Sequence, residues 1–105
     1  MARIRSNQPH FIYVVHEDGW FDGPSKIGTA TVVKYRVDGL RSGNWRKLMI
    51  FATYQVNSRS DALVVERDVL SMFADQRITA RDWVRVAPDD IARAVSTHPL
   101  VRKAT

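Results

Sequence analysis

A glutamate inside the apolar stripe of a predicted helix is the first residue of this sequence that could carry chemistry. The stripe repeats at helical spacing over residues 61–73 and consists of Ala62, Val65, Val69, Leu70 and Phe73. Glu66 belongs to the same stripe. An ionised carboxylate turned toward a core is costly unless a cation or a hydrogen-bond donor meets it. Glu66 therefore either reaches solvent or a structural arginine, or serves as a metal-ligand or catalytic carboxylate on a rigid helix.

Three more polar residues lie in predicted elements where an apolar residue would be ordinary. Tyr13 stands in the middle of an apolar strand, Lys26 lies in the following strand, and Arg36 is only partly off the apolar face of a helix. Because side chains alternate along strands, Tyr13 and Lys26 share one sheet face if the register of the hairpin allows it. The alternatives are a core tyrosine with its hydroxyl at the rim, a solvated strand lysine, and an arginine that neutralises Glu66.

The elements that must position these residues follow from the apolar patterning. It predicts strands at 11–16, 25–29 and 47–56, with Leu48, Ile50, Ala52, Tyr54 and Val56 alternating on one face. It predicts helices at 32–41, capped by Thr31, and from 61 to about 76, capped by Ser60 or Asp61. A short strand at 83–86 and a helix beginning at Pro88 complete the chain. The expected fold is an α/β (α+β) domain in which helices flank a small, mainly antiparallel central sheet in β-β-α-β-α order.

Length, charge and composition limit the class of protein. A chain of 105 residues is expected to form one domain, with a basic arm at 1–9, a core at 10–86, and a C-terminal helix and basic tail at 87–105. The net charge of +5 favours a polyanionic partner, above all nucleic acid. With no cysteine there is no disulfide or thiolate site, and the cytoplasm is the expected location. No membrane span and no signal peptide is expected.

Basic and amide side chains in or next to the predicted loops are candidates for contact with a nucleic-acid backbone. They are Arg41, Asn44, Arg46, Lys47, Arg77 and Arg81. The three histidines, His10, His16 and His98, lack the spacing of metal ligands and are predicted to be surface residues.

Around these residues the chain resembles the GIY-YIG nuclease superfamily, particularly its short, single-domain phage and bacterial members. Phe11-Ile12-Tyr13 stands at the first motif and Lys26-Ile27-Gly28 at the second, and Arg36 has the spacing of the family's helix arginine. Glu66 matches the family's metal-binding glutamate. Phe11 replaces a glycine, Lys26 replaces a tyrosine, and Leu70 stands where a histidine is common. Shorter similarities lie at residues 40–44 and 73–83.

The resemblance implies a metal-dependent DNA endonuclease with Tyr13, Lys26, Arg36 and Glu66 as catalytic residues. Glu66 would bind one Mg²⁺ or Mn²⁺ ion, Tyr13 would orient or deprotonate the attacking water with Lys26 beside it, and Arg36 would hold the scissile phosphate. Cutting both strands would then need a homodimer or sequential nicking. RNA remains an alternative substrate.

Two other functions stay open at this point. One is a catalytically weak or inactive domain of the same fold that binds nucleic acid. The other is a small basic protein-interaction module in which Glu66 and Arg36 form a structural pair. Metal dependence separates the enzyme from both, and salt-sensitive DNA binding separates the first alternative from the second.

Overall fold

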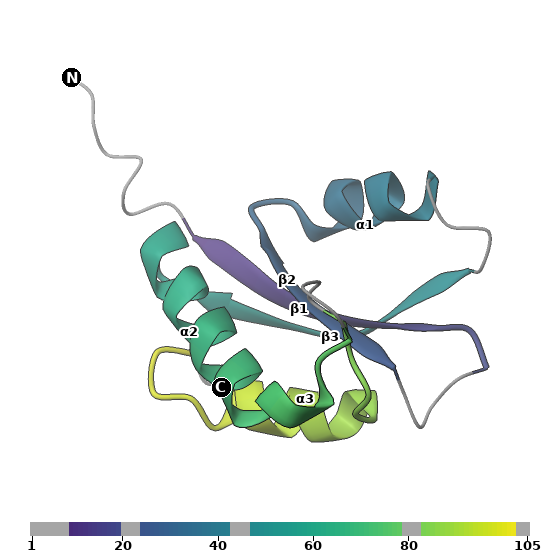
Figure 1. Ribbon diagram of the computed structural model, residues 1–105. Helices are drawn as coiled ribbons and strands as arrows, with labels where there is room; N and C mark the ends of the chain where they lie inside the picture. Colours follow the sequence, from purple (N-terminus) through teal and green to yellow (C-terminus); the bar gives the residue numbers. More distant parts are fainter. Residues whose placement is uncertain (1–8, 20–23, 43–46, 79–82, 103–105) are drawn as a thin grey trace.

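The sheet at the centre of the molecule has a helical layer on each face (Figure 1). The computed structural model describes residues 9–19, 24–42, 47–78 and 83–102. The four strands are antiparallel in the order β3-β1-β2-β4. They are β1 (His10–Glu17), β2 (Ser25–Ala30), β3 (Leu48–Val56) and β4 (Trp83–Val84). This arrangement confirms the predicted α+β fold class.

Helix α1 covers one face of the sheet, and helices α2 and α3 cover the other (Figure 1). The helices are α1 (Val33–Ser42), α2 (Arg59–Met72) and α3 (Pro88–Ser96), and a 3₁₀ turn, η2 (Ala74–Gln76), follows α2. None of the helices in the described ranges is long and apolar enough to cross a membrane.

Strand β1 is buried on both faces because it lies between β2 and β3 and under both helical layers. Its side chains alternate between the layers. Tyr13 and Val15 pack with Val37 of α1, whereas Ile12 and Val14 join the larger core beneath α2 and α3. The almost uninterrupted apolar run of this strand follows from this double burial.

A β-bulge in β3 breaks the regular alternation that the sequence predicted for residues 47–56. Val15 pairs with Ile50 and Val14 pairs with Ala52, so Phe51 is an extra residue between the two pairs. Ile50 therefore shares a face with Val15, and Ala52 lies on the opposite face with Val14. The prediction that Ile50 and Ala52 point the same way was wrong, because alternation counts residues and cannot detect an insertion.

The helix starts differ slightly from the predicted ones. Helix α1 begins at Val33. The N-cap of α2 is Ser58, whose hydroxyl accepts a hydrogen bond from the backbone N–H of Asp61 at 3.2 Å. The predicted caps at Ser60 and Asp61 were wrong because the chain leaves extended geometry at Ser58 itself, where φ is −156° and ψ is 168°. Helix α3 begins at Pro88, as predicted.

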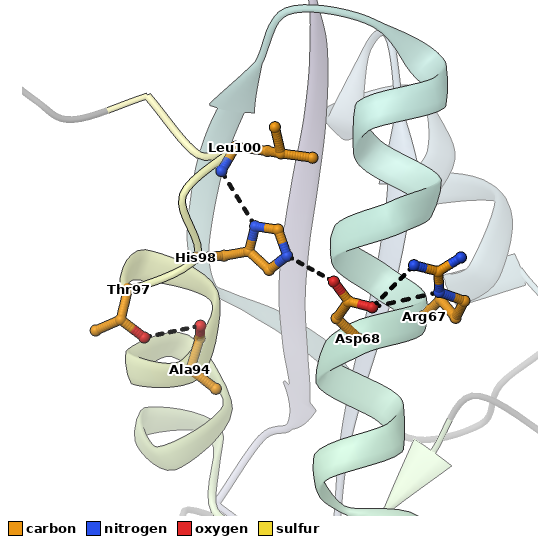
Figure 2. A network of polar contacts seen from close by, with 6 residues as sticks. All are labelled: Arg67, Asp68, Ala94, Thr97, His98 and Leu100. Atoms are coloured by element: carbon orange, nitrogen blue, oxygen red, sulfur yellow. Dashed lines mark hydrogen bonds and ion pairs between the residues drawn. The ribbon is translucent and has the colours of Figure 1, made fainter.

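The segment after α3 packs against the domain instead of starting a tail at residue 100. Val101 is 6% exposed and belongs to the larger core. The backbone N–H of Arg102 donates to the carbonyl of Gln55 in β3 at 2.9 Å. A side-chain contact supports the same segment: His98 Nε2 lies 2.9 Å from Asp68 Oδ2 of α2, and His98 Nδ1 accepts from the Leu100 N–H at 3.1 Å (Figure 2).

The prediction that the histidines are surface residues was wrong for all three. His10 is 7% exposed and His16 is 4% exposed, and the side chain of His98 is 12% exposed. His16 Nδ1 lies 2.9 Å from the carbonyl of Glu17, and its ring meets Phe51 edge-on with centroids 6.0 Å apart.

Candidate functional site

Tyr13 and Lys26 lie on the face of the sheet that α1 covers. The register pairs Tyr13 with Gly28 and Val15 with Lys26, and registered partners in antiparallel strands point to the same face. The shared face expected for Tyr13 and Lys26 is therefore present. The side chain of Tyr13 lies across Gly28, because a β-carbon at position 28 would overlap its hydroxyl and ring. Tyr13 is only 1% exposed, whereas Lys26 is half-buried.

Glu66 comes from the opposite layer. Successive helical residues are about 100° apart, which places position 66 between the buried Val65 and the core-packed Leu70 on the sheet-facing side of α2. Its side chain is half-buried, in agreement with the stripe seen in the sequence. The sheet thus separates the helical layer that carries Glu66 from the face on which Tyr13 lies.

Strand β2 is paired along only part of its outer edge. Strand β4 pairs only with Ser25 and Lys26, so within the described chain no strand pairs with the outer edge of β2 beyond them. The structure brings Tyr13, Gly28 and Lys26 together on one face. Convergence of these residues with Glu66 on a single surface stays a prediction.

Arg36 lies on the exposed side of α1 and lines an open groove with a volume of about 590 Å³. The groove lies where β1 begins, where β2 ends, and where α1 and α2 begin. Its lining residues are His10, Thr29, Ala30, Thr31, Val32, Tyr35, Arg36 and Arg59. None of these side chains is acidic, so the groove is electropositive. Burial, and then the Arg59 guanidinium, lower the pKa of His10 below its usual value of 6.5.

Sequence reasoning missed His10, Tyr35 and Arg59 as parts of one site. They come from three separate elements, and each resembles an ordinary surface or strand residue when it is considered alone. The sequence indicated this site only weakly. Tyr35 precedes Arg36 and lies off the apolar line of α1, so one helix places an aromatic ring next to a cation on its surface.

The predicted backbone-contacting residues have different surroundings. Arg41 donates from Nε and one terminal nitrogen to the carbonyl of Leu48 at 3.0 and 2.9 Å, and its other terminal nitrogen lies 2.9 Å from Asp38. The side chains of Lys47 and Arg77 are exposed. Asn44, Arg46 and Arg81 lie outside the described residues.

The arrangement of the His, Asp and Glu side chains limits which kind of metal site the domain can form. In the ranges that the structure describes, no three His, Asp or Glu side chains gather closely enough to form a protein cage for a metal. Mg²⁺ does not need such a cage, since it keeps several waters and binds through one or two carboxylates together with substrate phosphates. A single carboxylate at Glu66 fits that kind of site.

The fold and the groove define a small, basic α+β domain with an electropositive surface. The chain belongs to the T5orf172 domain family, whose sequence model matches residues 10–98, well over half of the chain. T5orf172 domains are associated with nuclease-like or DNA-binding functions in phages and bacteria. Neither the curated proteins nor the solved structures contain a significant match to the chain.

The family match corrects the assignment to the GIY-YIG superfamily, which was wrong: the matching family is T5orf172. The motif residues explain the error. Phe11 and Lys26 already depart from the two name-giving motifs, so the similarity rested on the order and spacing of several short motifs, each of them weak by itself. A hairpin followed by a helix supplies such spacing whatever the family.

Proposed function

We propose that this domain is a metal-dependent endonuclease that hydrolyses phosphodiester bonds in DNA, with Tyr13, Lys26, Arg36 and Glu66 as its catalytic residues. The observation that carries the proposal is the position of Glu66, a carboxylate on the sheet-facing side of α2. Desolvating a carboxylate in this way is costly, and a function that requires the charge explains why it is there. Membership of a family associated with nuclease-like functions supports the same conclusion.

Each residue has a chemical task in this proposal. Glu66 holds the divalent cation, Mg²⁺ or Mn²⁺, which supplies Lewis-acid stabilisation to the phosphate and the leaving oxygen when it is bound. Arg36 holds the phosphate through its planar fork of N–H donors. Tyr13 orients the attacking water or accepts its proton, and Lys26 lies on the same face of the sheet.

Nicking of supercoiled plasmid DNA tests the proposal. Wild-type protein should nick with Mg²⁺ or Mn²⁺ and not with a chelator, and Glu66→Gln should bind DNA but not cut it. Asp75→Asn, which removes an exposed carboxylate just after α2, is the matched control and should cut normally. Cleavage by Glu66→Gln at the wild-type rate would overturn the proposal.

The stability of Glu66→Gln separates a metal ligand from half of a structural ion pair. A metal-binding carboxylate among basic groups should lose little stability on amidation, because the volume is kept and only the charge is removed. Breaking a buried ion pair instead costs about 3–5 kcal/mol, which lowers the melting temperature of a domain of this size by well over ten degrees. Thermal unfolding without metal distinguishes the two outcomes.

Two observations favour a second candidate, a domain that binds nucleic acid without cutting it. Tyr13 is almost fully buried, and Glu66 lies in the layer opposite to it. In this case DNA affinity falls steeply with salt, because phosphate contacts release counterions, while no metal supports nicking. Affinity that does not change between low and physiological salt would argue against both candidates.

A further inference from the structure

The groove at the start of helices α1 and α2 is lined by two arginines, Arg36 and Arg59. Among the described residues, neither Arg36 nor Arg59 has a carboxylate within ion-pair distance. Three other described arginines are paired with aspartates: Arg41 with Asp38 at 2.9 Å, Arg67 with Asp68 at 3.1 Å, and Arg93 with Asp90 at 3.4 Å. Two cations that line one groove from different layers, with no counter-charge paired to them in the described part of the chain, favour an external anion.

The groove also offers neutral hydrogen-bond donors. Thr29 and Thr31 contribute hydroxyl groups to its wall. The first turn of α1, which begins directly beyond Thr31, contains no acidic residue that would offset its free backbone N–H groups. A planar guanidinium beside hydroxyl donors is well suited to the oxygens of a phosphate.

A large aromatic ring stands beside the two arginines. Tyr35 is 71% exposed and Val32 is 48% exposed, and both line the groove. A tyrosine left this open makes little contribution to the core, but its ring presents a flat apolar surface to solvent. Bases that are not stacked in a duplex bind such rings, and every base can do so because each has a π face.

We propose that this groove binds an unpaired nucleotide of a nucleic-acid strand, with its phosphate between Arg36 and Arg59 and its base stacked on Tyr35. This proposal deepens the proposed function. It rests on the proposed binding of nucleic acid and does not depend on cleavage. It makes DNA with a single-stranded stretch the preferred ligand, since a base inside a duplex cannot expose its face to Tyr35. The buried imidazole of His10 forms part of the same wall.

Fluorescence anisotropy with the full chain, in a chelator so that no cleavage occurs, tests the proposal. The probes are a labelled single-stranded oligonucleotide and a blunt duplex of the same sequence. Wild-type protein should bind the single strand more tightly than the duplex. Tyr35→Ala should weaken single-strand binding about tenfold, which is the contribution of one base stacked on an aromatic ring. It should leave duplex binding nearly unchanged, because a paired base does not stack on Tyr35.

Arg59→Ala tests the phosphate contact. It should weaken binding of both probes and reduce the slope of log affinity against log salt by about one, as expected for one lost phosphate contact. Arg67→Ala is the matched control, because Arg67 is an exposed arginine of the same helix that already pairs with Asp68. Circular dichroism of each variant shows that it is folded.

The possible outcomes separate this proposal from the proposed function. The proposal for the groove would be overturned, even if plasmid nicking is observed, by either of two results. One is an equal loss of affinity for Arg59→Ala and Arg67→Ala. The other is an equal loss of affinity for both probes in Tyr35→Ala. If the binding pattern is as expected but no metal ion supports nicking, nucleotide binding by the groove is established and the endonuclease proposal is rejected. Failure of the wild-type protein to bind either probe would overturn the proposal that the groove binds a nucleotide.

Discussion

The hydroxyl group of Tyr13 occupies the space that a β-carbon on residue 28 would need. Glycine at that position is therefore required by packing, since it lets an aromatic side chain from β1 lie flat over β2. Tyr13 cannot easily give way, because it is 1% exposed and packs with Val15 and Val37 under α1. The contact fixes where the tyrosine hydroxyl points, whatever its chemical role.

Gly28→Ala should destabilise the domain by about 1–3 kcal/mol, the usual cost of overpacking a core. In a Tyr13→Ala background the same change should cost much less, because the clashing ring is absent. Denaturant unfolding of the two single variants and the double variant measures this coupling. Gly39→Ala is the control: nothing lies within 4 Å of its β-carbon, and alanine in a helix should add about 0.5–1 kcal/mol. Additive effects of Gly28→Ala and Tyr13→Ala would contradict the packing argument.

The sequence predicted the element order well because apolar periodicity reports local geometry. The run at residues 11–16, the stripe around Glu66 and the proline-led start of α3 all gave the correct element. What the sequence could not predict depends on pairing across the sheet. The bulge at Phe51 and the burial of His10 are produced by neighbours distant in the chain.

The candidate site was partly predictable for the same reason. Alternation along the hairpin allowed Tyr13 and Lys26 to share one face if the register permitted it, and the pairing of Tyr13 with Gly28 and of Val15 with Lys26 provides that register. The assignment of Glu66 to a sheet-facing stripe was also correct. Periodicity does not say which face of the sheet a helix covers, so it could not show that Tyr13 and Glu66 belong to different layers.

Ser58→Ala should lower the stability of the domain by about 1 kcal/mol. The hydroxyl of Ser58 accepts from the Asp61 N–H, so its removal leaves a donor in the first turn of α2 without its cap. A loss of this size corresponds to about 4–8 °C in melting temperature. Ser60→Ala should have a smaller effect, because within the described residues the Ser60 hydroxyl hydrogen-bonds only with that of Ser58, at 3.1 Å. Equal effects of the two changes would contradict the assignment of the cap.

His10 should titrate below its usual pKa of 6.5 in the folded protein, chiefly because of burial and secondly because of Arg59. The unfolded chain then takes up this proton first as the pH falls. The contribution of neutral His10 to the stability of the folded protein is therefore complete above about pH 6.5. It is lost as the pH falls toward the pKa of His10 in the folded protein. In the described part of the chain, the charged groups at this end of the domain include Arg36 and Arg59, with Asp61 in the first turn of α2.

Arg59→Ala should raise the pKa of His10 only partway, because burial remains. Binding of an oligonucleotide phosphate in the groove should also raise it, since an anion favours the imidazolium. NMR titration of the His10 ring measures both effects, and Arg67→Ala serves as the control that should leave this pKa unchanged. A pKa that does not respond to Arg59→Ala would contradict the proximity of the two groups.

The contact between Asp68 and His98 should appear in the acid unfolding of the domain. The hydrogen bond from His98, and then that from Arg67, lower the pKa of Asp68 below 3.8. The stability that this carboxylate contributes is present above its usual pKa and is lost as the pH falls through the lowered value. His98→Ala should therefore raise the pKa of Asp68 more than Arg67→Ala does, as an NMR titration of the carboxyl carbon can measure.

The tautomer of His98 follows from the same geometry. Its Nδ1 accepts the Leu100 N–H, so Nε2 is the nitrogen that carries a proton and donates it to Asp68 (Figure 2). Nitrogen-15 spectra of the ring should show the Nε2–H tautomer at neutral pH. Predominance of the Nδ1–H tautomer would contradict both hydrogen bonds.

Arg41 should act on stability more than on nucleic-acid affinity. Its guanidinium donates twice to the carbonyl of Leu48, a residue that is 1% exposed. Arg41→Ala removes both donors and leaves that carbonyl without them, which should cost about 1–3 kcal/mol. Asp38→Ala is the control, because it removes only the exposed ion pair with Arg41 and should cost less than about 1 kcal/mol.

Anisotropy measurements on the same variants complete the comparison. At a temperature where Arg41→Ala is fully folded, its affinity for the single-stranded probe should remain close to that of the wild type, because most of its donors are already used within the domain. Arg59→Ala, whose guanidinium faces the groove, should lose affinity and keep its stability. A loss of affinity for Arg41→Ala as large as that for Arg59→Ala would show that nucleic acid reaches the C-terminal end of α1, and would extend the binding surface along the whole helix.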